Sequence, residues 1–450
     1  MRRGILTLAF LTLASGDVRL ALAQPSNVPY GLAARITPRA YLRMPPSANG
    51  KLPQQLSQTG AFIDTPKQIV SRGLIPYDVV VPFWSDGAHK SRWVAVPRGQ
   101  ICFSPTGEWS FPDGTVFVKT FSLPVDERHP EITRRLETRL LVRDSAGGVY
   151  GVIYKWRADG SDADLLTGSF TEHIPIRTAS GGIRMQTWYY PSRKDCLSCH
   201  TGRAGGVLGV KTRQMNRDFR YPSGVTDNEL RAWNHIGLFI PGFSDSEPSV
   251  FPKLAATDDT SRSLEDRARS YLDANCAQCH RPGGTAASFD TRYDIPLNQQ
   301  ELVDGPVLYD LGIDHPRVIS PHDIWRSLAL MRMDTVGEIK MPPLARETID
   351  ERGVALMRNW ILSMPGRSVV APPVIAPTGG TYAGLVEVTV QEAEPGAEIH
   401  YTLDGSVPGR SDPRYEGPVK LTGPTVFRAR AFKDGLTRSI TVQDVFIVGK

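Results

Sequence analysis

The stretch DANCAQCHRPGG, residues 273–284, contains Cys-x-x-Cys-His and continues into a basic, glycine-rich turn. The stretch KDCLSCHTGRAGG, residues 194–206, has the same two features. Four of the five cysteines of the chain lie in these two motifs. The chain is therefore organised around a chemistry that uses two thiols and one imidazole together, and uses them twice.

Zinc binding and disulfides are the first alternatives for such a motif. Zinc ribbons usually place the second CxxC pair about 15–20 residues after the first, whereas Cys196 and Cys276 are 80 residues apart. Neither a four-cysteine zinc site nor a disulfide within each CxxC needs the adjacent histidine. Covalent haem attachment uses all three residues, because two thiols bond the vinyl groups and the histidine binds the iron.

We therefore expect two c-type haems. The residues that tether them are Cys196, Cys199, Cys276 and Cys279, and the axial iron ligands that follow are His200 and His280.

The sixth iron ligand decides whether the iron is closed to substrates. Met341 lies in Lys340-Met-Pro-Pro-Leu344, 61 residues after His280, where two prolines stiffen the segment. We expect Met341 to be the second axial ligand of the second haem, with a packed core methionine as the alternative. For the first haem the ligand stays open, and the candidates are Met215, His235, Met44 or an open position.

The N-terminus has the layout of a secretory signal peptide. MRRGILTLAFLTLASGDVRLALAQ combines a basic start, a short apolar run and Ala21-Leu22-Ala23. The apolar run is too short to span a bilayer, which makes a retained anchor the weaker alternative. Cleavage after residue 23 predicts a periplasmic or secreted protein without a transmembrane helix. The net charge would change from +5 to +3, which gives no support to nucleic-acid binding.

Hydrophobic patterns predict strands first, then helices, then strands again. Residues 115–121 alternate, and residues 136–142 and 149–156 flank the turn DSAGG as a hairpin. Capping patterns predict one helix that starts at Ser263 and runs into Cys276, and another that starts at Thr348. On the apolar stripe of the second helix, Gly353 would let another helix approach closely.

The region around the second motif resembles a class I cytochrome c domain, with a helix, CxxCH, loops, a Met-Pro-Pro segment and a closing helix over 261–366. Residues 35–366 are similar to a family of exported two-haem c-type cytochromes. The matching stretches are GLIPYDVVVPFWSDGAHKSRWVAVP, CLSCH with VLGVKTRQMN, and ANCAQCHRPGG with FDTRYDIPL and MPPLA. The resemblance implies electron carriage, sometimes beside a quinoprotein sugar dehydrogenase.

The C-terminal residues, about 377–448, carry GGTYAGLVEVTV, IHYTLDGSVP and FRARAFKDGLTRS. They resemble the small β-sandwich at the C-terminus of chitobiase and β-hexosaminidase enzymes. The resemblance implies a structural or docking role ahead of direct carbohydrate binding, and both stay open.

The expected fold class is multidomain α+β, with a β-rich N-terminal region, an α-helical cytochrome c haem region and a small all-β C-terminal sandwich. The expected divisions are a signal peptide (1–23), a β-rich domain (24–190), a first haem segment (191–260), a cytochrome c-like domain (261–366), a linker (367–380) and the sandwich (381–450).

These features favour an exported dihaem c-type cytochrome that transfers single electrons from a donor, such as a quinoprotein dehydrogenase, to a respiratory acceptor. One alternative is a dihaem peroxidase with an open iron. Another is a surface or carbohydrate-binding protein in which haem is a sensor.

Two other features invite a catalytic interpretation. Ser85, Asp86 and His89 lie together in WSDGAHK, but catalytic triads usually converge from separate segments. We expect a hydrogen-bonded turn at a domain interface instead. Cys102 is the fifth cysteine, and we expect a buried apolar thiol.

Overall fold

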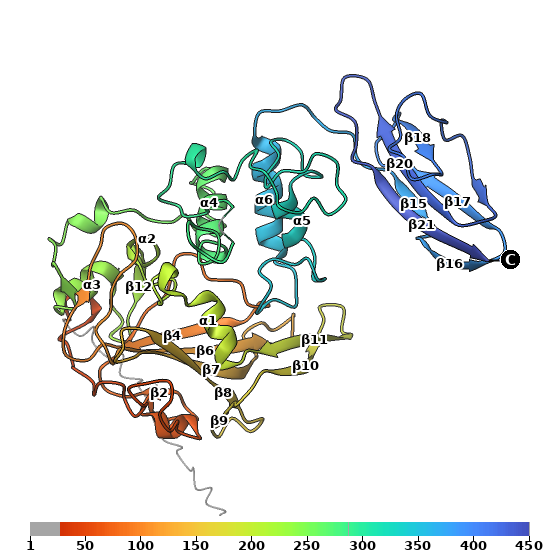
Figure 1. Cartoon of the computed structure of the whole chain (residues 1–450). Coiled ribbons are helices and arrows are strands. Elements are labelled where there is room, and N and C mark those ends of the chain that lie inside the picture. Colours follow the sequence, from red (N-terminus) through yellow and green to blue (C-terminus); the bar gives the residue numbers. More distant parts are fainter. Residues whose placement is uncertain (1–27, 287, 450) are drawn as a thin grey trace, which may run out of the picture.

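The computed structural model describes residues 28–286 and 288–449, so the expected signal peptide lies outside the described residues. Figure 1 shows a β-rich N-terminal part, a middle part with short helices and a C-terminal sandwich. Within the described part of the chain, no helix is both long and apolar enough to cross a bilayer.

The centre of the N-terminal part is a six-stranded antiparallel sheet with the strand order β3-β4-β6-β7-β8-β9. The expected hairpin over β7 and β8 is confirmed. The strands are β3 (Leu74–Pro76), β4 (His89–Ala95), β6 (Val116–Pro124), β7 (Thr133–Arg143), β8 (Val149–Trp156) and β9 (Ala163–Leu165).

Both faces of this sheet are covered. Successive side chains of a strand point to opposite faces, so Val116 and Val118 of β6 pack in one apolar cluster while Phe117 packs in another. The second face carries helix α1, which crosses the sheet in Figure 1. This face is the one that positions the candidate site.

Short two-stranded pairs surround the sheet. One of them, the parallel pair of β5 and β14, joins the N-terminal part to the segment after the first motif. The strands are β1 (Phe62–Asp64) with β2 (Ile69–Val70), β5 (Ile101–Cys102) with β14 (Phe239–Ile240), β10 (Phe170–Arg177) with β11 (Ile183–Tyr190), and β12 (Asp218–Arg220) with β13 (Thr226–Asn228).

Six α-helices occur in the described residues, and the longest has 13 residues. They are α1 (Arg193–Cys199), α2 (Thr212–Met215), α3 (Glu229–His235), α4 (Leu264–Asn275), α5 (Leu328–Met333) and α6 (Glu351–Ser363). Short 3-10 turns are η1 (Pro29–Gly31), η2 (Leu56–Thr59), η3 (Gly202–Ala204), η4 (Glu247–Ser249) and η5 (Leu297–Gln299).

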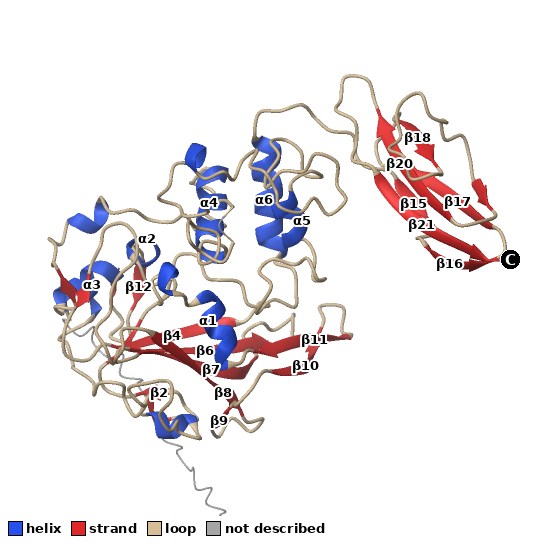
Figure 2. Ribbon diagram, in the orientation of Figure 1, coloured by secondary structure: helices blue, strands red, loops and turns tan. Residues whose placement is uncertain are grey.

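The expected α-helical haem region over 191–366 is wrong, and so is the α+β class that depended on it. Figure 2 shows short helices separated by long loops in this part of a β-rich molecule. Among the described residues between α4 and α6, the helical elements are α5 and the single turn η5. The reason is that this stretch has frequent prolines and glycines, which end helices, and its apolar residues lack a sustained helical period.

Helices α4 and α6 pack directly against each other. A Cβ on Gly353 would lie 2.6 Å from Cζ of Tyr271, so the expected close approach at this glycine is confirmed. Ser263 caps α4 by accepting from the Asp266 N–H, also as expected. The cap expected at Thr348 is wrong, because Asp350 caps α6 by accepting from the Gly353 N–H.

The C-terminal part is a two-layered β-sandwich, as expected. One sheet has the order β15-β17-β19 and the other β16-β21-β20-β18, with Phe427 and Phe446 fully buried in the core. The strands are β15 (Val374–Ala376), β16 (Gly380–Ala383), β17 (Val386–Gln391), β18 (Glu398–Thr402), β19 (Val419–Leu421), β20 (Thr425–Phe432) and β21 (Val442–Gly449).

The sandwich is anchored to the middle part by a charged cluster. Asp314 accepts hydrogen bonds from Arg430 Nη2 at 2.8 Å and from the Thr441 N–H at 2.9 Å. Arg326 donates to Asp314 and to the Ser439 carbonyl. The segment 367–380 also includes β15, and Val370 is fully buried in the sandwich core.

Candidate functional site

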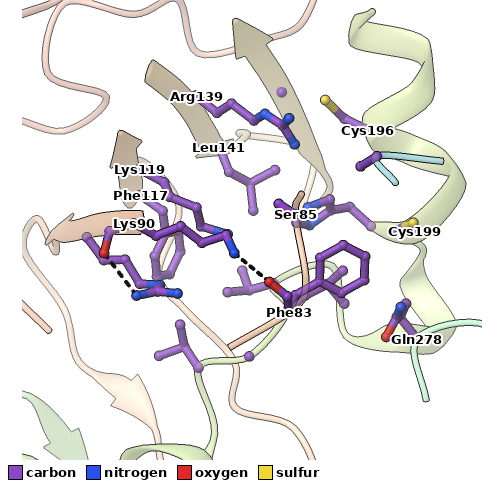
Figure 3. A pocket seen from close by; sticks show the side chains of 18 of the residues that line it. Phe83, Ser85, Lys90, Phe117, Lys119, Arg139, Leu141, Cys196, Cys199 and Gln278 are labelled. Carbon is purple, nitrogen blue, oxygen red and sulfur yellow. Dashed lines mark hydrogen bonds between the residues drawn. The ribbon is translucent and has the colours of Figure 1, made fainter. Parts of the chain in front are cut away.

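A cavity of about 190 Å³ lies between the sheet and helix α1. Its floor consists of alternate residues of neighbouring strands, and Figure 3 shows these side chains facing the motif cysteines. The floor residues include Lys90 and Arg92 of β4, Phe117 and Lys119 of β6, Arg139 and Leu141 of β7, and Gly151 of β8.

The first motif forms the opposite wall on helix α1, which follows strand β11 in the chain. Ser192 caps α1 by accepting from the Asp195 N–H, and the Asp195 carboxylate accepts from the Ser192 N–H in return. The thiol of Cys196 then lies over Gly151, where a Cβ would be 2.6 Å from Sγ. Cys196, Cys199 and His200 all line the cavity.

His200 has the arrangement that a ligating imidazole needs. Its Nδ1–H donates to the Gly206 carbonyl at 2.7 Å, so Nε2 carries the free lone pair. Metal-bound histidines commonly donate their second nitrogen to a backbone carbonyl in this way. Burial lowers the pKa of His200 to about 4, so the ring is neutral at pH 7. A second hollow of about 440 Å³ also has His200 in its lining.

The second motif starts at the C-terminal end of α4. Burial raises the pKa of Cys276 to about 12 and lowers the pKa of His280 to about 4. The His280 ring stacks on Phe289 with 4.1 Å between ring centroids. Its Nδ1 is buried, and a hydrogen bond with the backbone of Ala286 partly opposes the effect of burial on the pKa of the ring.

The two motifs meet in the structure. The Cys199 and Cys279 thiols are close enough to interact, and this interaction raises the pKa of Cys199 and lowers that of Cys279. The turns that follow the motifs also touch, because Arg281 Nη1 donates to the Arg203 carbonyl at 3.0 Å. Arg281 Nη2 further binds Glu108 at 3.0 Å. Residues 80 positions apart in the sequence therefore form one cluster.

Met341 lies in an irregular segment on the side of the second motif. Its N–H donates to the Arg332 carbonyl at 2.9 Å, and the charge of Arg332 acts on His280. Buried Arg346 donates to three carbonyls of this neighbourhood, those of Arg332, Met333 and Thr335. The structure thus links Met341 and His280 through a shared neighbour, and the assignment of Met341 as a ligand stays a prediction.

The three candidates for the open ligand of the first haem lie elsewhere. Met215 is fully buried in an apolar cluster of the N-terminal part. Met44 packs in the cluster on the other face of the sheet, near the Tyr154 hydroxyl. His235 is exposed on α3 with its ring against Tyr30. None of the three is among the described residues that line the cavity at His200.

The turn at residues 84–89 joins parts of the molecule, as expected. Asp86 accepts from the N–H groups of Glu347 and Thr348, at 2.7 and 2.8 Å. The Trp84 N–H donates to Asn275 at the end of α4. His89 is exposed, and no hydrogen bond joins its ring to Ser85 or Asp86 in the described part of the chain, so the three do not form a triad. The expected burial of Cys102 is wrong, because this thiol is exposed at the short strand pair.

Sequence analysis missed the basic side chains of the cavity floor. Lys119 lies in the middle of β6, between buried Val118 and Thr120. A lysine inside a strand that is buried on both faces is unusual. This local signal was available, but the alignment of Lys119 with cations of neighbouring strands depends on strand register.

Comparison with known proteins concerns the C-terminal part. Residues 377–443 match the chitobiase/beta-hexosaminidase C-terminal domain. The expected sandwich at the end of the chain is thereby confirmed. No curated protein matches the chain. Neither comparison supports the cytochrome c domain expected over 261–366.

Proposed function

We propose that this chain is an exported dihaem c-type cytochrome that passes single electrons between redox partner proteins. The observation that carries the proposal is the first motif, where Cys196, Cys199 and His200 line one cavity. The Nδ1–H bond of His200 to Gly206 leaves Nε2 free to bind iron. A haem attached there would supply reversible one-electron chemistry at its iron.

The second motif supports the same chemistry through the burial of its histidine. Burial lowers the pKa of His280 to about 4, and a ligating imidazole must be neutral. The ring also interacts with the backbone of Ala286, as the His200 ring does with Gly206. Cys276 and Cys279 would tether the second haem, and Met341 would complete its coordination.

The contact between the two motifs also has a role in this proposal. Cys199 and Cys279 are neighbours, so the two attachment points adjoin and electrons would pass between the sites over a short distance. The donor and acceptor are redox proteins outside the cytoplasm, with a quinoprotein dehydrogenase as donor and a respiratory acceptor.

A second candidate function rests on the same contact. Two adjacent thiols can lose two protons and two electrons to an exported thiol oxidant and form a disulfide. If Cys199 and Cys279 did so, the protein would be a dithiol carrier. This reaction and haem attachment exclude each other, because both use the same sulfur atoms.

Intact mass separates the two candidates. After expression with a c-type maturation system, we expect the mature chain to carry two haems. Cys196→Ala/Cys199→Ala and Cys276→Ala/Cys279→Ala should each carry one. Cys102→Ala, at the cysteine outside the motifs, is the matched control and should keep two. A bare polypeptide would refute the cytochrome proposal, and one lighter by two hydrogens would support the dithiol carrier.

A further inference from the structure

The floor of the cavity carries a row of positive charges. In the register of the sheet, Arg92 of β4 lies opposite Lys119 of β6, and Lys119 lies opposite Arg139 of β7. Lys90 precedes Arg92 by two residues and therefore lies on the same face of β4. All four side chains line the cavity of the first motif, and Figure 3 shows Lys90, Lys119 and Arg139 pointing into it. We call these four residues the basic row.

Like charges placed directly opposite each other destabilise a sheet. The basic row is only partly neutralised by protein groups. Arg139 binds Glu137, with Nη2 and Oε1 2.6 Å apart, and Arg92 binds Asp78. Asp78 is shared with Arg217, at 2.9 Å, so its charge is divided between two guanidinium groups.

The two lysines of the row have no carboxylate within ion-pair distance among the described residues. Lys90 Nζ donates to the Phe83 carbonyl at 2.6 Å, and Lys119 Nζ lies over the Phe121 ring. Both lysine side chains are half-buried, and both line the cavity. Burial and the charge of Arg92 lower the pKa of Lys119 to about 7.

A buried cation is costly unless an anion pairs with it. The cavity that these lysines face is also the cavity of Cys196, Cys199 and His200. We propose that Lys90 and Lys119 bind the two propionate carboxylates of the first haem, with Arg92 and Arg139 beside them. This inference rests on the proposed function and assigns the orientation of the macrocycle over the sheet.

The number and the charge of the groups on each side agree with this assignment. A haem has two propionates, and the row has two ammonium groups without a carboxylate partner. Charge-assisted hydrogen bonds between such groups are about twice as strong as neutral ones. The apolar lining residues, among them Val79, Val81, Leu141 and Val207, suit the porphyrin ring rather than its acids. The row would thus hold the carboxylate edge while the thiols hold the vinyl edge.

The test uses the haem-loaded protein and the variant Lys90→Gln/Lys119→Gln. Resonance Raman spectroscopy records the propionate bending band, and spectroelectrochemistry records the midpoint potential of each haem. We expect the band of one haem to shift and its potential to fall, because two cations near the iron are lost. Lys155→Gln is the matched control, since Lys155 lies in the same sheet but pairs with Glu172 at 3.2 Å and does not line the cavity.

The outcomes are separable. Wild-type protein without covalent haem would refute the proposed function itself. Two haems with an unchanged propionate band and potential in the double variant would overturn only the propionate assignment. If the double variant fails to fold, the single variants Lys90→Gln and Lys119→Gln decide, each with half of the change expected. Lys119→Arg should keep the wild-type band, and a band shifted as in Lys119→Gln would contradict the assignment.

Discussion

At the scale of single residues, two small features determine how the first motif meets the sheet. Gly151 leaves room for the Cys196 thiol, and Gly206 accepts the Nδ1–H of His200. Gly151 lies on a distant strand, and Gly206 lies in the glycine-rich turn that follows CxxCH. The geometry of the motif therefore depends on residues outside CxxCH itself.

Gly151→Val should remove the first attachment site. The new side chain would occupy the position of the Cys196 thiol, since even a Cβ would approach Sγ to 2.6 Å. We expect the intact mass to show one covalent haem instead of two. Gly168→Ala, at an exposed glycine with open space around it, should keep two. Two haems on the Gly151 variant would contradict this role.

Met341→Ala should change the second haem alone. A thioether ligand raises the reduction potential of a haem, so its loss should lower that potential and remove the weak far-red absorption band of the oxidised protein. Met331→Ala, at a half-buried methionine of α5, is the control and should leave both unchanged. An unaltered spectrum in the Met341 variant would assign the methionine to packing.

At the scale of elements, the second motif is positioned by the crossing of α4 and α6. Tyr271 of α4 packs on Gly353 of α6, and α4 ends where the motif begins at Cys276. The two helices have different capping residues, Ser263 and Asp350. Their contact belongs to the apolar cluster next to the second motif, which also includes Cys276 and Phe289.

Gly353→Ala should destabilise this crossing. Overpacking in a core typically costs about 1–3 kcal/mol, which exceeds the gain of about 1 kcal/mol from helix propensity. We expect a lower free energy of unfolding in denaturant titrations. Arg352→Ala, at the exposed neighbouring position of α6, should change it little. A stabilised Gly353 variant would show that Tyr271 moves without cost.

At the scale of the whole molecule, buried ion pairs hold the parts together. Asp273 of α4 is fully buried and binds Lys211 at 2.9 Å and Arg213 at 2.8 Å. The second of these cations belongs to α2, in the segment after the first motif. At the other end, Asp314 and Arg326 connect the middle part to the sandwich.

Asp273→Asn should weaken the fold and change its response to acid. Removing one partner of a buried ion pair costs about 3–5 kcal/mol. We expect a smaller cost here, because Arg213 keeps Asp294 at 3.2 Å and Lys211 keeps Glu108 at 3.7 Å. Burial alone would raise the pKa of Asp273, but Lys211 and Arg213 outweigh it and hold the pKa well below its usual range.

The stabilisation from Asp273 is therefore complete above the unfolded pKa of about 3.9 and is lost as the pH falls below it. Unfolding free energies measured from pH 7 to pH 2 should show a smaller acid loss in Asp273→Asn than in the wild type. Asp258→Asn, at an exposed carboxylate, should follow the wild-type curve. If Asp273→Asn lost as much unfolding free energy between pH 7 and pH 2 as Asp258→Asn, the role of Asp273 would be refuted.

Asp314→Ala should release the sandwich from the middle part without unfolding it. The sandwich core does not include Asp314, whereas the contacts to Arg430 and Thr441 cross the boundary. We expect a larger radius of gyration in small-angle scattering and faster proteolysis at exposed Arg367, just before the residues that pack in the sandwich. Asp310→Ala, at an exposed position of the same loop, is the control. An unchanged radius would show that other contacts are sufficient.

Much of the local structure was predictable from the sequence. The hairpin of β7 and β8 followed from alternation around DSAGG, and the start of α4 followed from the cap at Ser263. The α-helical haem region was not correct, because capping patterns locate helix ends but do not show that the chain between two helices is helical. The choice of Asp350 over Thr348 was missed because Thr348 is bound by Asp86 from a distant segment.

The sequence by itself determined the two CxxCH motifs, the strands that alternate and the C-terminal sandwich, because each depends on residues close together in the chain. Only the tertiary structure decided that the motifs adjoin at Cys199 and Cys279, and that Arg92, Lys119 and Arg139 form one row. The physical reason is that strand register and long-range packing depend on contacts between distant segments. A local pattern contains the chemistry of a side chain but not the identity of the neighbour that it meets.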